Sequence, residues 1–333
     1  MISIGALPDD ILLLIFDSYL HEVRRNTIPE ESTRAWQSLI HVCRRWRSVV
    51  FGSPRHLDLR LCCTNTTRSR DLLDIWPALP LIIKGIGHYP TDNIAAALKC
   101  SDRVCQIDVV ISEILDWELY LAEMQQPFLE LTNLDLRWSR EIEMVVVPDS
   151  FLGGFAPRLE GLDLSGIPFP GLPKLLLSAT HLVQLRLHPI PHSGYLSPDV
   201  MVAALSTLTS LEDLSLGFKS PESCPGLEIR RLPPLTRSVL PALKSFEFKG
   251  VSEYLEDLVI DIDAPQLNQL GIMFFNDIIF DTPQLIQFVS RTPISIALKY
   301  SHIAFLDSAI RVTFQTMYTH VKLEVLIFCE GLD

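Results

Sequence analysis

The sequence predicts an α/β solenoid, with a helical segment at the N-terminus followed by a curved, parallel β-sheet. Two observations support this fold class. Apolar residues recur at helical spacing within the first 52 positions, and a leucine-rich pattern then repeats about every 27 residues. With 333 residues, of which 48% are hydrophobic, the chain is long enough to bury a large core.

The first expected helix spans about residues 8–20. Its apolar residues recur one, four, five and eight positions after the first, which places them on one helical face: Ile11, Leu12, Ile15, Phe16 and Tyr19. Pro8 suits the first position of a helix, and Asp9 and Asp10 complement the positive end of the helix dipole.

A second helix is expected after the polar spacer His21–Arg34. Its apolar positions show the same helical spacing and are Trp36, Leu39, Ile40, Val42, Cys43 and Trp46. The Phe-Gly-Ser-Pro segment at 51–54 is a typical stop signal, so this helix is expected to end there.

Both ends of this segment resemble a known docking module. The start, Leu7-Pro8-x-Asp10-Ile11-Leu12, and the end, Val42-Cys43-Arg44-Arg45-Trp46, resemble the F-box, by which substrate receptors dock on the Skp-family linker of cullin-RING ubiquitin ligases. The resemblance covers residues 4–52, although many F-boxes have a shorter spacer between their helices. It implies that a Skp-family linker, and through it a cullin, are partners. The residues that it places at the linker interface are Leu7, Pro8, Ile11, Leu12, Ile15, Phe16, Leu39, Val42, Cys43 and Trp46.

Roughly 50 residues in short helices bury too little surface to be securely stable alone, so another part of the chain or a partner must cover them. The alternative to the F-box is therefore an ordinary helical hairpin that caps the following domain. In that interpretation the same apolar residues pack inward.

Residues 56–333 contain the repeats. The pattern Leu-x-x-Leu-x-Leu and its looser copies predict eleven parallel strands, whose last apolar residues are at 59, 83, 109, 136, 164, 187, 216, 248, 272, 298 and 328. The mean spacing of about 27 residues lies in the range of leucine-rich repeats. The sequence therefore predicts a leucine-rich-repeat horseshoe with a parallel sheet.

Helices are expected between the strands, near residues 94–98, 114–121, 175–177, 200–205 and 285–289. Ser197-Pro198 and Thr282-Pro283 supply N-caps with proline at the first helical position. Such strand–helix alternation also suits a closed (β/α) barrel. Polar residues alternate with the leucines, however, which indicates that one face of the sheet is exposed to water and favours the open horseshoe.

The repeats differ in length, and the Asn or Cys that usually follows the last leucine of such repeats is missing. Irregular turns are therefore expected. The F-box motif, the Trp76-Pro77-Ala78-Leu79-Pro80 segment and the irregular repeats together are similar to the F-box family that is greatly expanded in mushroom-forming fungi.

A target protein is expected on the water-exposed face of the sheet. Equivalent positions of several strands place charged residues of both signs there, and the candidates are Asp135, Arg137, Asp163, Arg186, Glu247 and Lys249. No dominant aromatic anchor accompanies them. The residues therefore indicate a protein-binding face without identifying the target.

Composition and motifs argue against several function classes. The net charge of −12 opposes broad nucleic-acid binding, and no long apolar run predicts a membrane helix. Seven scattered cysteines without a secretory start predict a reducing compartment, the cytoplasm or the nucleus. The sequence lacks the spacing of a phosphate loop, a catalytic serine motif or a zinc site, so neither an enzyme nor a cofactor or metal is expected.

Two functions follow. The first is the substrate-recognition subunit of an SCF-type cullin-RING ubiquitin ligase, which binds the linker with its helices and the target with its repeats. The second is a non-catalytic leucine-rich-repeat scaffold that binds a protein without ubiquitination.

The last strand, 323–328, raises a separate question, because only five residues follow it and a repeat array needs a polar terminal unit. We expect the chain to be a fragment, or its open end to pair with another molecule.

Overall fold

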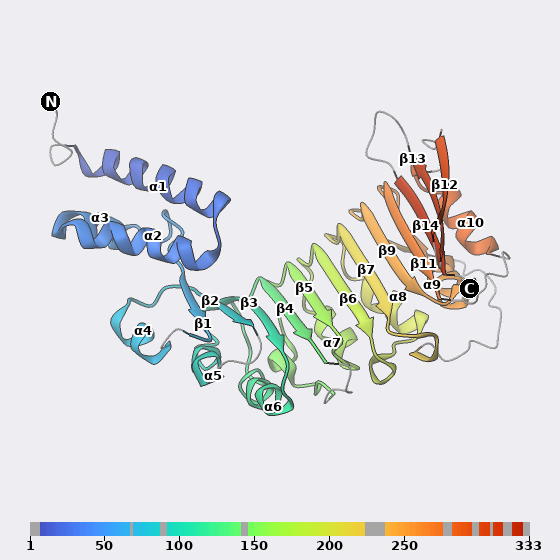
Figure 1. Ribbon diagram of the computed structural model, residues 1–333, viewed down its shortest axis with the longest axis horizontal. Coiled ribbons are helices and arrows are strands. Elements are labelled where there is room, and N and C mark those ends of the chain that lie inside the picture. Colours follow the sequence, from blue (N-terminus) through green and yellow to red (C-terminus); the bar gives the residue numbers. More distant parts are fainter. Residues whose placement is uncertain are drawn as a thin grey trace.

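The computed structural model describes residues 7–66, 69–86, 92–140, 146–223, 237–275, 282–294, 300–306, 309–315 and 322–328. A twelve-stranded sheet runs through most of the chain (Figure 1). In spatial order its strands are β1 (Leu61–Thr64), β2 (Leu81–Ile86), β3 (Val104–Ile111), β4 (Asn133–Trp138), β5 (Gly161–Ser165), β6 (Gln184–Ile190), β7 (Asp213–Phe218), β9 (Ser245–Gly250), β11 (Gln269–Phe274), β14 (Lys322–Phe328), β13 (Ala309–Gln315) and β12 (Tyr300–Leu306).

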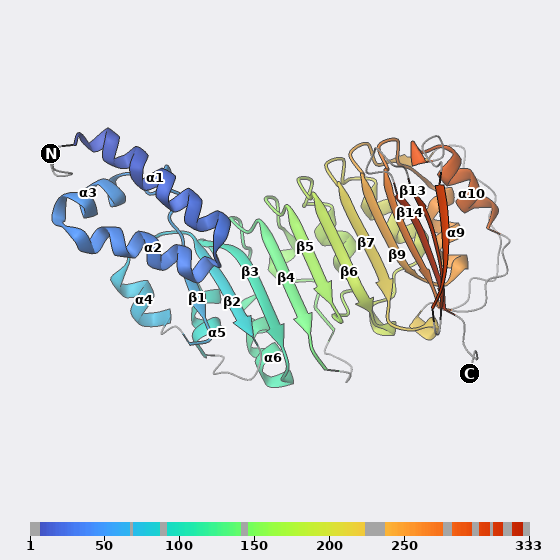
Figure 2. The ribbon, with the colours of Figure 1, turned by 45° about the horizontal axis from the view of Figure 1, so that its top comes forward.

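Three helices precede the sheet and form what we call the helical head: α1 (Asp9–Asn26), α2 (Pro29–Val42) and α3 (Arg44–Gly52). The other helices follow one face of the sheet, so that its opposite face stays open along most of its length (Figure 2). They are α4 (Ser69–Ile75), α5 (Asp92–Leu98), α6 (Ile114–Glu123), α7 (Leu172–Leu176), α8 (Pro198–Leu205), α9 (Ser252–Ile260) and α10 (Pro283–Ser290). Single 3₁₀ turns lie at Phe151–Gly154, His192–Gly194 and Pro221–Ser223, and β8 (Ser238–Val239) pairs with β10 (Ile262–Asp263) in a small separate sheet.

The architecture is α/β with a mostly parallel sheet, as predicted. All pairs from β1 to β14 are parallel, whereas β14, β13 and β12 pair antiparallel. Strands β1 and β12 are the two edges of the sheet, so among the described strands no pairing closes it. The closed-barrel alternative is therefore wrong.

Register follows the leucine pattern. Leu134, Leu162 and Leu185 are direct partners on neighbouring strands, and all three are buried on the helix-covered side. Residues one position further along point to the open face, since side chains alternate along a strand. One such row crosses all twelve strands in register and consists of Thr64, Lys84, Asp108, Asp135, Asp163, Arg186, Ser215, Glu247, Gly271, Glu324, Thr313 and His302.

Most expected strands and helices are present, with local differences. Leu57 is buried in a turn and Leu59 is buried directly after it, and the first strand begins at Leu61, two residues beyond Leu59. Helices α4 and α9 were not expected, although the buried Tyr254, Leu255, Leu258 and Val259 of α9 show helical spacing in the sequence. The strand expected to end at 298 lies outside the described residues.

The helical head differs more from the expectation. The spacer His21–Arg34 is mostly helical, because α1 continues to Asn26 and α2 begins at Pro29. The expected second helix is interrupted at Cys43, whose backbone is extended. There the Cys43 Sγ accepts a hydrogen bond from the Trp46 N–H and caps α3. A sulfur acceptor at an N-cap is unusual, and the helical spacing across this position concealed the break.

An aromatic cluster joins the helical head to the sheet. Trp36 of α2 is 2% exposed, and its ring centroid lies 5.3 Å from Trp76 and 6.2 Å from Phe51. Its indole Nε1 donates a hydrogen bond of 3.0 Å to the carbonyl of Arg60, the residue before β1. The Arg24 guanidinium donates another, of 2.7 Å, to the Leu57 carbonyl.

The C-terminal strand corrects the sequence interpretation. Strand β14 lies inside the sheet, paired on one side with β11 and on the other with β13. It is therefore not the unpaired terminal edge that motivated the expectation of a fragment or of pairing with another molecule. The edge is β12, which is earlier in the chain and antiparallel to its neighbour.

Helix α10 has a cap that the sequence did not predict. Pro283 is at the first helical position, but the Thr282 side chain makes no capping hydrogen bond. The Glu256 carboxylate of α9 accepts instead from the backbone N–H groups of Gln284 and Leu285, at 2.9 and 2.7 Å. A long-range acceptor thus replaces the local one.

We predict that Glu256→Ala lowers the free energy of unfolding by about 1–2 kcal/mol, because two helix N–H groups lose a charged acceptor. Urea denaturation followed by circular dichroism measures the change. Glu253→Ala on the same helix is the matched control, since the Glu253 carboxylate accepts only from the neighbouring Ser252 hydroxyl among the residues that the structure describes. Equal stability of the two variants would contradict the capping role.

Candidate protein-binding surfaces

Helix α1 has two adjacent apolar faces. Leu12, Phe16 and Leu20 are buried against the rest of the helical head. Beside them, Ile11, Leu14, Ile15 and Tyr19 form an apolar stripe with 38%, 58%, 43% and 43% of their surfaces exposed. Spacing of three and four residues keeps these four side chains on one side of the helix. We call them the α1 stripe.

The predicted linker-binding residues divide between these environments. Leu12, Phe16 and Leu39 are buried, and Leu7 and Trp46 are half-buried. Pro8, Ile11, Ile15, Val42 and Cys43 are exposed. Leu14 and Tyr19 were not in the predicted set, although the helical spacing that selected Ile11 and Ile15 also places them on that side.

A charged contact holds the corner of the helical head together. The Arg45 guanidinium lies 2.7 Å from the Asp9 carboxylate and also donates to the Leu7 carbonyl. Below it, the rings of Phe16 and Trp46 are 4.7 Å apart. These contacts fix the start of α3 against the start of α1, so the α1 stripe is carried by a defined scaffold.

The N-terminal half of the open face is charged and internally paired. The Arg137 guanidinium lies 2.6 Å from Asp108 and 2.9 Å from Asp135, and the Lys84 ammonium lies 3.8 Å from Asp108. Asp135 and Asp163 are direct partners on β4 and β5. The predicted proximity of these charges across neighbouring strands is therefore present.

Two carboxyl groups in this row are unfavourably placed. Burial raises the pKa of Asp163 above the usual aspartate value, and His188, Arg186 and Arg137 offset this only in part. The Asp163 Oδ1 atom is buried and has no hydrogen-bond partner among the described residues. Burial, followed by the adjacent Asp163 charge, also raises the pKa of Asp135.

We predict that Asp163→Asn stabilises the protein at about pH 7, because the variant no longer holds a partly desolvated negative charge. A raised pKa means that the folded state binds the proton more tightly than the unfolded chain, so the wild type loses stability as pH rises through that pKa. The gain should shrink towards about pH 4, where the unfolded carboxyl is itself half protonated. Urea denaturation at both pH values measures it, with Asp102→Asn at an exposed site as control. A gain that is independent of pH would contradict this assignment.

A hollow of about 820 Å³ separates α2 from the first strands of the open face. Glu30 and Arg34 of α2 line one side, and Cys62, Lys84 and Arg137 of the sheet line the other. Burial, together with the Glu30 carboxylate, raises the pKa of Cys62 to about 12, so this thiol stays protonated at neutral pH. The helical head thus borders the same face that carries the paired charges.

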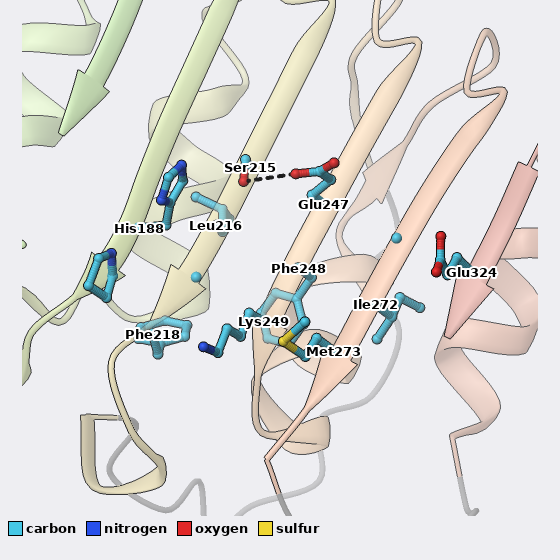
Figure 3. Close-up of a pocket in the computed structure, with 13 residues that line it drawn as sticks. His188, Ser215, Leu216, Phe218, Glu247, Phe248, Lys249, Ile272, Met273 and Glu324 are labelled. Carbon is cyan, nitrogen blue, oxygen red and sulfur yellow. Dashed lines mark hydrogen bonds between the residues drawn. The ribbon is translucent and has the colours of Figure 1, made fainter. Parts of the chain in front are cut away.

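A second hollow lies in the C-terminal half of the open face (Figure 3). It has a volume of about 510 Å³ and is bounded by strands β6, β7, β9, β11 and β14. We call it the C-terminal hollow; its lining residues include His188, Ser215, Gly217, Glu247, Lys249, Gly271, Met273 and Glu324.

The predicted target-binding residues are thus spread over the open face. Asp135 and Arg137 lie on β4, Asp163 and Arg186 on β5 and β6, and Glu247 and Lys249 line the C-terminal hollow. Glu324 was missed because the sequence does not reveal that β14 pairs directly with β11. Met273 was also missed, although alternation along β11 after the buried Ile272 places it on the open face.

Within the described residues, no three histidine, cysteine, aspartate or glutamate side chains come together as a metal site. None of the helices in those residues is long and apolar enough to cross a membrane. Comparisons with protein-family models, curated proteins and solved structures found no match.

Proposed function

We propose that this protein is the substrate-recognition subunit of an SCF-type cullin-RING ubiquitin ligase. In this proposal the helical head is an F-box that docks on a Skp-family linker, and the sheet with its helices is an irregular leucine-rich-repeat domain that binds the target. The observation that carries the proposal is the α1 stripe, a row of exposed apolar side chains on the first helix of the segment whose sequence resembles the F-box.

The two surfaces suit the two partners. A row of exposed apolar side chains on one side of a helix is typical of a helical docking interface, in which a few central residues supply most of the binding energy. The open sheet face is polar and extended, and it lies on a different part of the chain from the α1 stripe. The chain performs no bond chemistry in this role. It holds the target close to a catalytic partner in the cytoplasm or nucleus, and proximity lowers the barrier.

One observation favours the scaffold alternative. Leu12, Phe16 and Leu39 pack inward, as expected of a helical hairpin that caps the following domain. The two hypotheses differ in whether the α1 stripe binds a partner. A capping hairpin needs no partner on that stripe, whereas an F-box does.

Co-expression with a Skp-family linker tests the proposal. We expect a stoichiometric complex in size-exclusion chromatography with light scattering, with a dissociation constant below about 1 μM. Affinity purification from the source cell should then recover linker, cullin and target together. Absence of a linker complex at about 10 μM of each protein would reject the proposal, and recovery of a target without linker would support the scaffold.

A further inference from the structure

The sheet ends in a long strand, β12, at the side away from the helical head (Figure 1). Among the described strands, β12 pairs with β13 alone, and this pairing runs without a bulge from Tyr300 to Leu306. The outer side of β12 therefore presents a row of backbone N–H and C=O groups that no described strand pairs with.

This edge lacks the usual protection against pairing with another chain. Natural sheets protect their edges with charged residues, proline, bulges, short strands or a covering helix. The segment 300–306 contains no lysine, arginine, aspartate, glutamate or proline. At the opposite edge, β1 has only four residues, and Thr33 and Trp36 of α2 donate hydrogen bonds to the carbonyl of Arg60, directly before it. The long uncharged edge is thus at the C-terminal end of the sheet.

The core side of the sheet opens at the same place. Ile272, Val325, Val312 and Ile303 are direct partners across β11, β14, β13 and β12. Exposure rises along this row, since Ile272 is buried, Val325 and Val312 are half-buried, and Ile303 is 56% exposed. Ile303 is therefore an exposed apolar side chain at the middle of the β12 edge.

A second copy of the same strand fits this edge. Two antiparallel copies, related by a two-fold axis at Ile303 and perpendicular to the sheet, place each Ile303 directly opposite the other. The same register places His302 opposite Ala304. Apolar cross-strand pairs stabilise a sheet, and in this register no two like charges face each other. The strand is therefore complementary to itself.

Charge repulsion between copies is small at this end of the molecule. The whole chain carries a net charge of −12, but residues 300–328 contain two basic residues, Arg311 and Lys322, and two acidic ones, Asp307 and Glu324, so their net charge is 2 − 2 = 0. Charges further away are screened, because the Debye length is about 8 Å at physiological ionic strength. The C-terminal strands thus suit a second copy better than the acidic remainder of the chain does.

We propose that two copies of this protein associate through β12, as an antiparallel strand pair centred on Ile303. The contact closes at two copies, because it uses the β12 edge of each. Both open faces then lie on the same side of one continuous sheet. This inference goes beyond the proposed function and does not rest on it.

Sedimentation velocity of the full chain, between about 1 and about 100 μM, tests the association. One strand pair makes a small interface, so we expect a dissociation constant of about 10 μM. Hydrogen exchange at the two ends of this range locates the contact. Amides of β12 should exchange more slowly at the higher concentration, and those of β1 at the same rate in both. A monomer throughout, or a dimer without added protection of β12, would overturn the proposal.

Substitutions on the axis test the register. In Ile303→Lys, and likewise in Ile303→Glu, like charges would face each other, so each variant should self-associate at least about 10-fold more weakly. An equimolar mixture of the two should dimerise again, because opposite charges then meet, and this recovery shows that neither variant is misfolded. Ile286→Lys on α10, where the isoleucine is 66% exposed, is the matched control and should dimerise normally. Normal dimers of both Ile303 variants, or no recovery in the mixture, would overturn the proposal.

These tests are independent of the linker, which is expected on the α1 stripe at the other end of the sheet. Dimerisation without a linker complex would reject only the ligase role. A linker complex with a receptor that stays monomeric would reject only the strand pairing.

Discussion

Replacing Ile11 and Ile15 together by aspartate should abolish capture of a Skp-family linker. Both side chains belong to the α1 stripe, and central apolar anchors of helical interfaces typically contribute about 2 kcal/mol or more each. The double change should therefore weaken binding by roughly 1000-fold, before the cost of burying two carboxylates is added. Isothermal titration calorimetry with purified linker measures the affinity directly.

The control for this prediction uses isoleucines that are even more exposed. Ile75 on α4 and Ile286 on α10 are 70% and 66% exposed and lie outside the helical head. Ile75→Asp and Ile286→Asp should leave linker binding unchanged. Because Ile11 and Ile15 are also exposed, the double variant should lose no more than about 1 kcal/mol of stability. Leu14→Asp tests the α1 stripe separately and should also weaken linker binding. Normal linker binding by this variant and by the Ile11 and Ile15 double variant would refute the docking surface.

Periodicity predicted α1 but did not separate its two faces. Spacing alone places Ile11 beside Leu12 and Ile15 beside Phe16, since the apolar arc is wider than one packing contact needs. Which half is buried depends on where α2 and α3 lie, and that is set by contacts distant in the sequence, such as the one between Arg45 and Asp9. The sequence could therefore nominate the helix but not its exposed residues.

In the sheet, too, the local sequence pattern predicted some features, whereas others depend on contacts between segments distant in the sequence. Leucines repeated at constant spacing predicted the strands and their register, because side chains alternate between the two faces. The final strands are different. Nothing in the local pattern indicates that β14 inserts beside β11 while β13 and β12 extend the sheet beyond it. Glu324 consequently entered the C-terminal hollow only when the pairing of strands was known.

Trp36 packs between the helical head and the sheet, so its replacement should cause a large loss of stability. Trp36→Ala should lower the free energy of unfolding by about 3–5 kcal/mol, because it leaves a cavity beside Phe51 and Trp76 and removes the shorter of the two hydrogen bonds to the Arg60 carbonyl, which keeps only the Thr33 hydroxyl at 3.3 Å. Trp36→Phe keeps most of the packing and loses the indole hydrogen bond, so we expect about 1–2 kcal/mol.

The segments that each variant destabilises distinguish a residue that links the helical head to the sheet from an ordinary core residue. Trp117 of α6 is fully buried in the sheet domain, so Trp117→Ala is a matched control with a similar overall cost. In hydrogen exchange, Trp36→Ala should speed exchange in α1–α3 selectively, while Trp117→Ala should not. Identical exchange patterns in the two variants would show that Trp36 does not hold the helical head in place.

If the proposed function holds, Trp36→Ala should also impair ubiquitination of the target more than it impairs binding of either partner. Transfer by proximity needs a fixed distance between the α1 stripe and the open face, whereas each binding event needs only its own surface.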